Sequence, residues 1–152
     1  MMANRITPYL KWLVAAGIFL FPVTFALVWP MSYWFEVRTV HINDARVGEQ
    51  ITMLVDREVK ESFVGTYGVT IHKWSSTGPV AYCRMNGGPW EYRQGAAYPI
   101  PLTLAWWTEH AKACNPLPVG QYQVTTRWVK PGNVLLPEKS TSNTSNIFTV
   151  NP

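Results

Sequence analysis

The feature that most constrains this 152-residue chain is a stretch of 24 residues near its N-terminus, Trp12–Phe35, that contains no charged side chain. A helix of that length extends about 36 Å, more than the roughly 30 Å hydrocarbon core of a bilayer. The sequence therefore predicts a short N-terminal tail over residues 1–11, a transmembrane helix over 12–35 and one further domain over 36–152.

The charges beside this stretch predict its direction. Arg5 and Lys11 precede it, and no acidic residue occurs before Glu36. Because positive flanks stay on the cytoplasmic side, we expect a cytoplasmic N-terminus and an exported domain. Aromatic side chains typical of a membrane interface stand at the two ends of the stretch: Trp12, Trp29, Tyr33 and Trp34.

Two other interpretations of the stretch stay open. A cleaved signal peptide has a shorter apolar core, of about 7–15 residues, that ends in small residues. Thr24-Phe25-Ala26 is a poor cleavage site of that kind, and the apolar run continues beyond it. The third interpretation is a buried helix of a soluble protein.

Composition limits the classes of partner. Residues 36–152 are enough for a single core, and aromatic residues make up 14% of the chain. After residue 35 the chain has eleven Lys and Arg against nine Asp and Glu, a net charge of about +2. That charge is too weak and too scattered for a nucleic-acid-binding protein. We also expect that the protein binds no cofactor.

The two cysteines, Cys83 and Cys114, predict a disulfide, because the expected topology places both in an oxidising compartment. Closing a loop of about 30 residues stabilises a fold by roughly 3–4 kcal/mol in the chain-entropy model. The alternative is a pair of buried, reduced thiols. No Cys/His spacing typical of zinc sites occurs.

Beyond the N-terminal stretch, apolar and polar residues alternate as they do in β-strands. We expect seven short strands, which indicate an antiparallel sandwich or barrel. Their ranges are Phe35–Ile42, Gln50–Lys60, Thr66–Trp74, Pro79–Met85, Ile100–Thr108, Gly120–Lys130 and Ser145–Val150. We also expect a turn at Asn86-Gly87-Gly88, a helical turn over Thr108–Ala113 and a polar loop over Pro131–Ser145.

The segment Leu117–Tyr122 resembles the corner before the penultimate strand of immunoglobulin and fibronectin type III domains. The resemblance implies that Tyr122 turns its hydroxyl back to the preceding loop and that Gly120 forms the tight corner. Residues 146–150 likewise resemble a last sandwich strand. The two cysteines do not occupy the inter-sheet positions of antibody domains. The implied fold is an all-β, immunoglobulin-like antiparallel sandwich of about seven strands.

A second resemblance is to uncharacterised proteins of alphaproteobacteria and their phages. It implies a bacterial or phage origin and no activity. The ordered pattern that carries it is Tyr67-x-Val69, Cys83, Trp90-x-Tyr92, Leu104-x-Trp106-Trp107, Cys114 and Gly120-x-Tyr122.

Residues with catalytic potential form no recognisable motif. His41, His72 and His110 lack the spacing of a metal site. Glu91 and Glu109 are available as a carboxylate pair of the kind that glycosidases use, but no motif joins them. We therefore expect that the protein is not an enzyme.

Five aromatic residues have two interpretations, as core or as a binding surface: Trp90, Tyr92, Tyr98, Trp106 and Trp107. Trp106 is in phase with Leu102 and Leu104 on an expected strand, which favours the core. Trp90 and Trp107 are expected to be exposed.

The loop over Pro131–Ser145 contains three consecutive apolar residues, Val134, Leu135 and Leu136. Such a run indicates either contact with a partner or burial against a neighbouring element. Both interpretations stay open.

These observations favour a single-pass protein of a bacterial inner membrane, with its domain in the periplasm. We expect a binding or assembly module that docks on another envelope protein. One alternative is a phage structural or virion-associated protein. Another is a glycan- or peptidoglycan-binding domain that uses Trp90, Tyr92 and Trp107. The sequence specifies neither the partner nor the oligomeric state.

Overall fold

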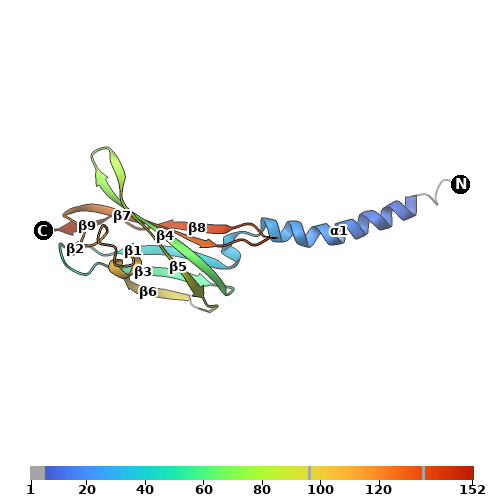
Figure 1. The fold of residues 1–152 in the computed structure, drawn as a ribbon, viewed down its shortest axis with the longest axis horizontal. Helices are drawn as coiled ribbons and strands as arrows, with labels where there is room; N and C mark the ends of the chain where they lie inside the picture. Colours follow the sequence, from blue (N-terminus) through green and yellow to red (C-terminus); the bar gives the residue numbers. More distant parts are fainter. Residues whose placement is uncertain (1–5, 96, 135) are drawn as a thin grey trace.

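The computed structural model of this protein describes residues 6–95, 97–134 and 136–152, and it consists of a β-sandwich with a long helix standing away from it (Figure 1). The helices are α1 (Ile6–Val28), η1 (Met31–Tyr33) and α2 (Leu104–Trp107). The strands are β1 (Phe35–Ile42), β2 (Ala45–Arg46), β3 (Thr52–Val59), β4 (Phe63–Ser75), β5 (Gly78–Tyr92), β6 (Ala97–Thr103), β7 (Gly120–Lys130), β8 (Lys139–Thr144) and β9 (Phe148–Asn151).

The strands form two sheets that face each other. One has the order β1-β3-β6, and the other has the order β2-β9-β7-β4-β5, with β8 also paired to β7. Neighbours are antiparallel except β2 and β9, which run parallel. The predicted β-rich sandwich is confirmed, and its arrangement is compatible with an immunoglobulin-like domain.

Alternating side chains of β4 and β7 fill the space between the sheets. Tyr67, Val69 and Ile71 of β4 are buried, as are Val124 and Trp128 of β7. Because successive side chains of a strand point to opposite faces, this alternation places a polar row on the outer face of the same strands. The predicted ranges of β1 and β7 agree with the structure.

The predicted helix over 12–35 has different bounds in the structure. Helix α1 starts at Ile6 and ends at Val28, and Pro30 has an extended conformation (φ −72°, ψ 159°). Proline cannot donate the helical hydrogen bond, and it disfavours helical geometry at the residue before it. Phe35 opens β1 and is buried in the core. The end of the uncharged stretch therefore belongs to the sandwich.

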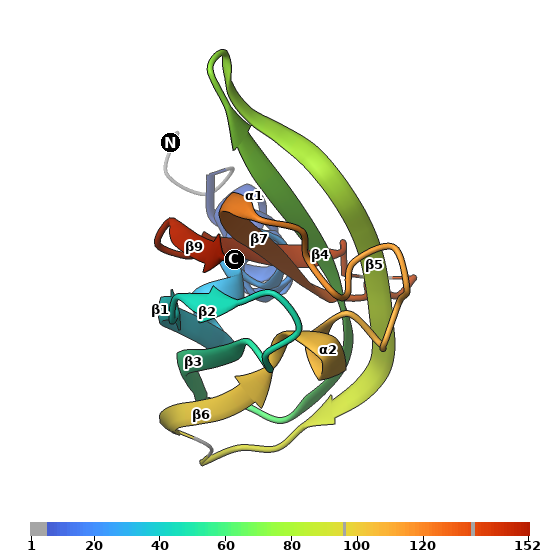
Figure 2. The same ribbon diagram turned by 90° about the vertical axis from the view of Figure 1, so that its left-hand side faces the viewer.

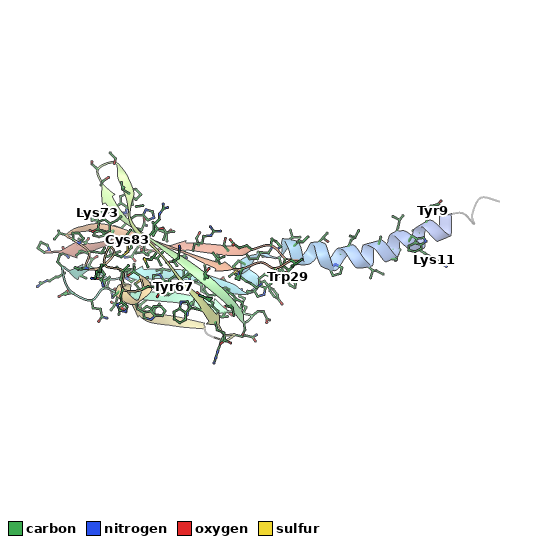
Figure 3. The ribbon with its side chains drawn as sticks, viewed as in Figure 1. Tyr9, Lys11, Trp29, Tyr67, Lys73 and Cys83 are labelled. Atoms are coloured by element: carbon green, nitrogen blue, oxygen red, sulfur yellow. A yellow bond between two sulfur atoms is a disulfide. The ribbon has the colours of Figure 1, made fainter. Side chains whose placement is uncertain are left out.

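Helix α1 projects from one end of the sandwich (Figure 1), and the large apolar side chains of α1 whose burial is described are exposed, among them Trp12, Leu13 and Val28. Figure 3 shows Tyr9 and Lys11 at its far end and Trp29 where it meets the domain. Within the described parts of the chain, no helix combines the length and the apolar character needed to cross a membrane. The predicted transmembrane helix thus has no support from the structure.

The junction between α1 and the sandwich is held by aromatic and basic side chains. Trp29 packs on Tyr33 with ring centroids 4.0 Å apart, and Tyr33 packs on Trp34 at 5.0 Å. The ammonium of Lys130 lies 4.9 Å from the ring of Trp34. The ammonium of Lys139 donates to the carbonyl of Leu27 at the end of α1. These contacts fix where the helix leaves the domain.

The predicted turn at Asn86-Gly87-Gly88 is wrong, because β5 continues through it, with a register shift in its pairing to β4 between Gly65 and Tyr67. Gly87 lies under the buried ring of Tyr67, and a Cβ at this position would lie 2.3 Å from Tyr67 Cζ. The glycine therefore permits close packing between neighbouring strands. The chain turns earlier, at Gly78, whose φ of 111° favours glycine.

The predicted loop over Pro131–Ser145 is partly wrong, since β8 occupies Lys139–Thr144. Its composition, KSTSNT, lacks the apolar alternation of a half-buried strand, so this strand could not be predicted from the residue pattern. In the remaining loop Val134 is fully exposed and Leu136 is half-buried. The predicted contact residue Leu135 lies outside the described residues.

We predict that Gly87→Ala destabilises the fold by about 1–3 kcal/mol, because the new methyl group overlaps a ring that the core holds in place. Gly68→Ala is the matched control in β4, where the added Cβ would meet the side-chain oxygen of Asn86 at 3.0 Å. Urea unfolding of both variants measures the difference. Equal stability of the two variants would contradict the packing role of Gly87.

Candidate functional site

Helix α2 interrupts the segment that was predicted as a strand over Ile100–Thr108. β6 ends at Thr103, whose side-chain oxygen accepts a hydrogen bond from the backbone N–H of Trp106 (3.2 Å) and so caps the helix. The predicted helical turn over Thr108–Ala113 is therefore displaced, because α2 precedes it and Thr108 is its C-terminal cap.

The helix reverses the predicted exposure of two tryptophans. Trp107 is 1% exposed and Trp106 is 42% exposed, whereas strand alternation predicted the opposite. Side chains of a helix do not alternate between two faces, so the inference from Leu102 and Leu104 fails here. Trp90 is exposed as expected, at 45%.

A pocket of about 140 Å³ lies where α2 meets strands of both sheets. We call this pocket and its lining the aromatic site. It is lined by Arg57, Tyr67, Trp90, Glu91, Tyr92, Trp106 and Trp107. Figure 2 shows α2 at the open side of the sandwich, between β6 and β5.

Four aromatic rings of the site form a continuous row from the core to the surface. Tyr67 stacks on Trp107 with centroids 4.8 Å apart and an interplanar angle of 20°. Trp107 is 5.8 Å from Trp106, which is 6.0 Å from Trp90. The inner two rings are buried and the outer two are half-exposed, so the row ends in an apolar surface open to solvent.

Several contacts hold α2 against the sandwich. The indole N–H of Trp107 donates to the hydroxyl of Thr126 on β7 (3.0 Å). The predicted disulfide Cys83–Cys114 is confirmed, and it ties β5 to the segment after α2 across a sequence separation of 31 residues. A loop of this length contributes about 3–4 kcal/mol in the chain-entropy model. The disulfide therefore links β5, which contains Trp90, to the segment that follows α2, which contains Trp106.

A carboxylate is held beside the buried tyrosine of the row. The hydroxyl of Tyr67 donates to Glu109 Oε1 (3.3 Å), and burial together with that carboxylate raises the Tyr67 pKa. Glu109 and His110 have φ values of 51° and 55°, which side chains other than glycine rarely adopt. Such conformations often occur at functional sites. The sequence analysis noted both Glu109 and Tyr67, but it did not predict that they contact each other.

The remaining charged groups of the site are paired or stacked. The guanidinium of Arg57 lies 5.5 Å from the ring centre of Tyr92 and 6.0 Å from that of Phe35. Glu91 forms an ion pair with Arg93 (3.0 Å). Burial raises the pKa of Tyr92 to about 12, while Arg57 acts in the opposite direction. These side chains surround the rings with both signs of charge.

A larger and shallower hollow, of about 370 Å³, lies over the β5-β4-β7 sheet. Gly68 and Gly88 line it, together with Arg127, which pairs with Glu138 (3.2 Å). The hollow has no exposed aromatic side chain, and its one arginine is engaged within the chain. We therefore place the candidate site at the aromatic site.

The other predicted site residues lie elsewhere. The hydroxyl of Tyr122 donates to the carbonyl of Pro118 (2.8 Å), the geometry that the resemblance implies, and Gly120 precedes it. Among the residues that the structure describes, no group of three or more His, Cys, Asp or Glu side chains is placed to hold a metal ion.

A second exposed surface is the end of the β4–β5 hairpin, which we call the β4–β5 arm. It extends beyond the sandwich at the end away from α1 (Figures 1 and 2). Val80 is 56% exposed and Tyr82 is also exposed. In the described part of the chain β5 pairs only with β4, so its other edge is open.

Comparison with protein-family models gives no match, and no curated protein matches the chain.

We predict that Tyr92→Phe reduces the loss of stability at alkaline pH. Because the Tyr92 pKa is about 12 in the folded state and about 10 in an unfolded chain, the unfolded state releases the proton first. The protonated Tyr92 therefore contributes its full share of the free energy of unfolding below pH 10. This contribution is lost as the pH rises toward 12, by at most about 1.4 kcal/mol per pH unit. Urea unfolding between pH 9 and 12 should show a smaller slope in the variant. An unchanged slope would contradict the assignment.

Proposed function

We propose that this protein is a non-catalytic accessory module, anchored in a membrane by α1, whose sandwich docks on another protein of the cell envelope. The support for the anchor is the uncharged stretch in the sequence and the exposure of apolar side chains on α1. The support for the docking role is the exposed β4–β5 arm. The expected topology places the N-terminus in the cytoplasm and the sandwich in the periplasm.

The observation that carries the anchor is that α1 stands clear of the domain with large apolar side chains in solvent, among them Trp12, Leu13 and Ile18. Lys11 is the only charged residue among its 23 residues. A helix of this length extends about 35 Å. Exposed apolar surface on this scale favours an apolar environment. Since no helix of the described residues combines the length and apolar character needed to cross a membrane, the anchor is tested directly by fractionation.

The observation that favours docking is the position of the β4–β5 arm. With α1 in a membrane, the arm extends from the end of the sandwich that faces away from the bilayer (Figure 1). The arm presents Val80, and at its base Tyr82 packs on Tyr122 while part of its ring stays exposed beside the open edge of β5. An open edge offers backbone hydrogen bonds to a partner strand, and exposed apolar side chains add contact area. Anchoring also raises the local concentration of a partner in the same membrane.

We predict that the full-length protein stays in the membrane fraction after an alkaline carbonate wash. The double variant Ile18→Arg, Leu20→Arg should move to the soluble fraction, because each arginine in a bilayer core costs about 2.5–3.5 kcal/mol. Val47→Arg changes an exposed valine of the domain and is the matched control. Release of the unmodified protein by the wash would contradict the anchor.

We predict that a photo-reactive amino acid at Val80 forms one discrete cross-linked product in the host cells. The same residue at Ile147, which is also exposed but lies outside the arm, should form none. Mass spectrometry of the product identifies the partner. Equal products at both positions, or none at Val80, would exclude the arm as the docking surface.

A further inference from the structure

We propose that the aromatic site binds a saccharide, with a pyranose ring stacked on Trp90 and Trp106. This inference goes beyond the proposed function, since it names a ligand for a pocket of the sandwich that the docking role does not use. It does not depend on the membrane anchor or on the β4–β5 arm.

The two outer tryptophans form a bent apolar platform. Trp90 comes from β5 and Trp106 from α2, and their ring centroids are 6.0 Å apart with an interplanar angle of 36°. Both side chains are nearly half-exposed. The faces of the indole rings are electron-rich and attract the weakly positive C–H groups on the face of a sugar ring. The separation of the two rings is comparable to the length of one sugar residue.

Two carboxylates lie at or near this platform. Glu91 lines the pocket, and Glu109 is hydrogen-bonded to Tyr67, which also lines it. Carboxylates accept hydrogen bonds from several hydroxyl groups, and such bonds to a charged group are the stronger kind. Apolar faces combined with acceptors at their margins match a saccharide, which has both apolar faces and hydroxyl edges.

The ring spacing disfavours a cationic ligand held between aromatic faces. The rings of Trp90, Trp106 and Trp107 contact one another in a row at 5.8 and 6.0 Å, which leaves no space for a group between them. The pocket of about 140 Å³ holds a single ring and not a folded segment of protein. A ligand therefore has to lie on the platform, as a flat ring does.

The platform is held in place before any ligand arrives. Trp106 is supported by Trp107, which stacks on Tyr67 and donates to Thr126. The disulfide Cys83–Cys114 closes the segment after α2 onto β5. Such preorganisation lowers the entropic cost of binding. Sugars with all their substituents equatorial present two flat C–H faces, so we expect a β-1,4-linked chain of glucose or N-acetylglucosamine units.

Calorimetric titration of the full-length protein with cellotetraose and chitotetraose tests this inference. The detergent must lack a sugar headgroup. We expect saturable binding of at least one of the two. Trp90→Ala and Trp106→Ala should each weaken the affinity by about tenfold or more. Trp106→Phe, which keeps a smaller ring, should have an intermediate affinity.

Tyr82→Ala is the matched control, because this ring is as exposed as the two tryptophans but lies at the base of the β4–β5 arm, beside Tyr122 and outside the lining of the pocket. Its affinity should equal that of the unmodified protein. Near-ultraviolet circular dichroism and an intact disulfide establish that each variant is folded. The inference is overturned by the absence of binding to both tetrasaccharides, or by equal affinity in the unmodified protein and both alanine variants.

The two proposals fail separately. A protein released by carbonate that still binds a tetrasaccharide loses its anchor and keeps its saccharide site. A protein that stays in the membrane fraction but binds neither tetrasaccharide keeps its anchor and loses its saccharide site. Release of new reducing ends from a bound tetrasaccharide would support the site while contradicting the non-catalytic role.

Discussion

The packing of Tyr67 between Gly87 and Trp107 is the contact on which the rest of the candidate site depends. On one side the ring lies where a side chain at Gly87 would stand. On the other side it stacks on Trp107 of α2. The same tyrosine then uses its hydroxyl to hold Glu109. One buried ring therefore joins β4, β5, α2 and the strained segment that follows α2.

This arrangement supports Trp106, one of the two tryptophans nearest the surface, through its contacts with Trp107 and Trp90. An exposed Trp106 on a free loop would sample many orientations, and ordering it would oppose binding. Here its neighbour Trp107 is fixed in the core, and Cys114 is linked to β5. The site combines apolar aromatic rings with carboxylates that remain near solvent.

The strand pattern and the disulfide were predictable because both depend on local signals. Gly120–Lys130 alternates so regularly that its bounds agree with β7, and a chain with two cysteines allows a single disulfide pairing. The Tyr122 corner follows from a short local segment in the same way. The length of β5, the polar strand β8 and the helix α2 gave no such signal.

The candidate site was only partly predictable. Trp90 was recognised as exposed, whereas Trp106 and Trp107 were exchanged because their segment is helical. Arg57 and Tyr67 were not anticipated, because their contribution depends on strands that are distant in sequence. Glu91 and Glu109 were noted as a pair, but no motif indicated that Glu91 lines the pocket or that Glu109 is bound by Tyr67 behind it.

The sequence by itself determined the β-rich sandwich, the disulfide and an uncharged N-terminal stretch, since each follows from residue type and spacing along the chain. Only the tertiary structure decided where that stretch stops being helix, because Phe35 is taken into the core. It also decided which tryptophan faces solvent and why Gly87 lies within a strand. Those features depend on contacts between distant segments, and such contacts leave no periodic signal in the sequence.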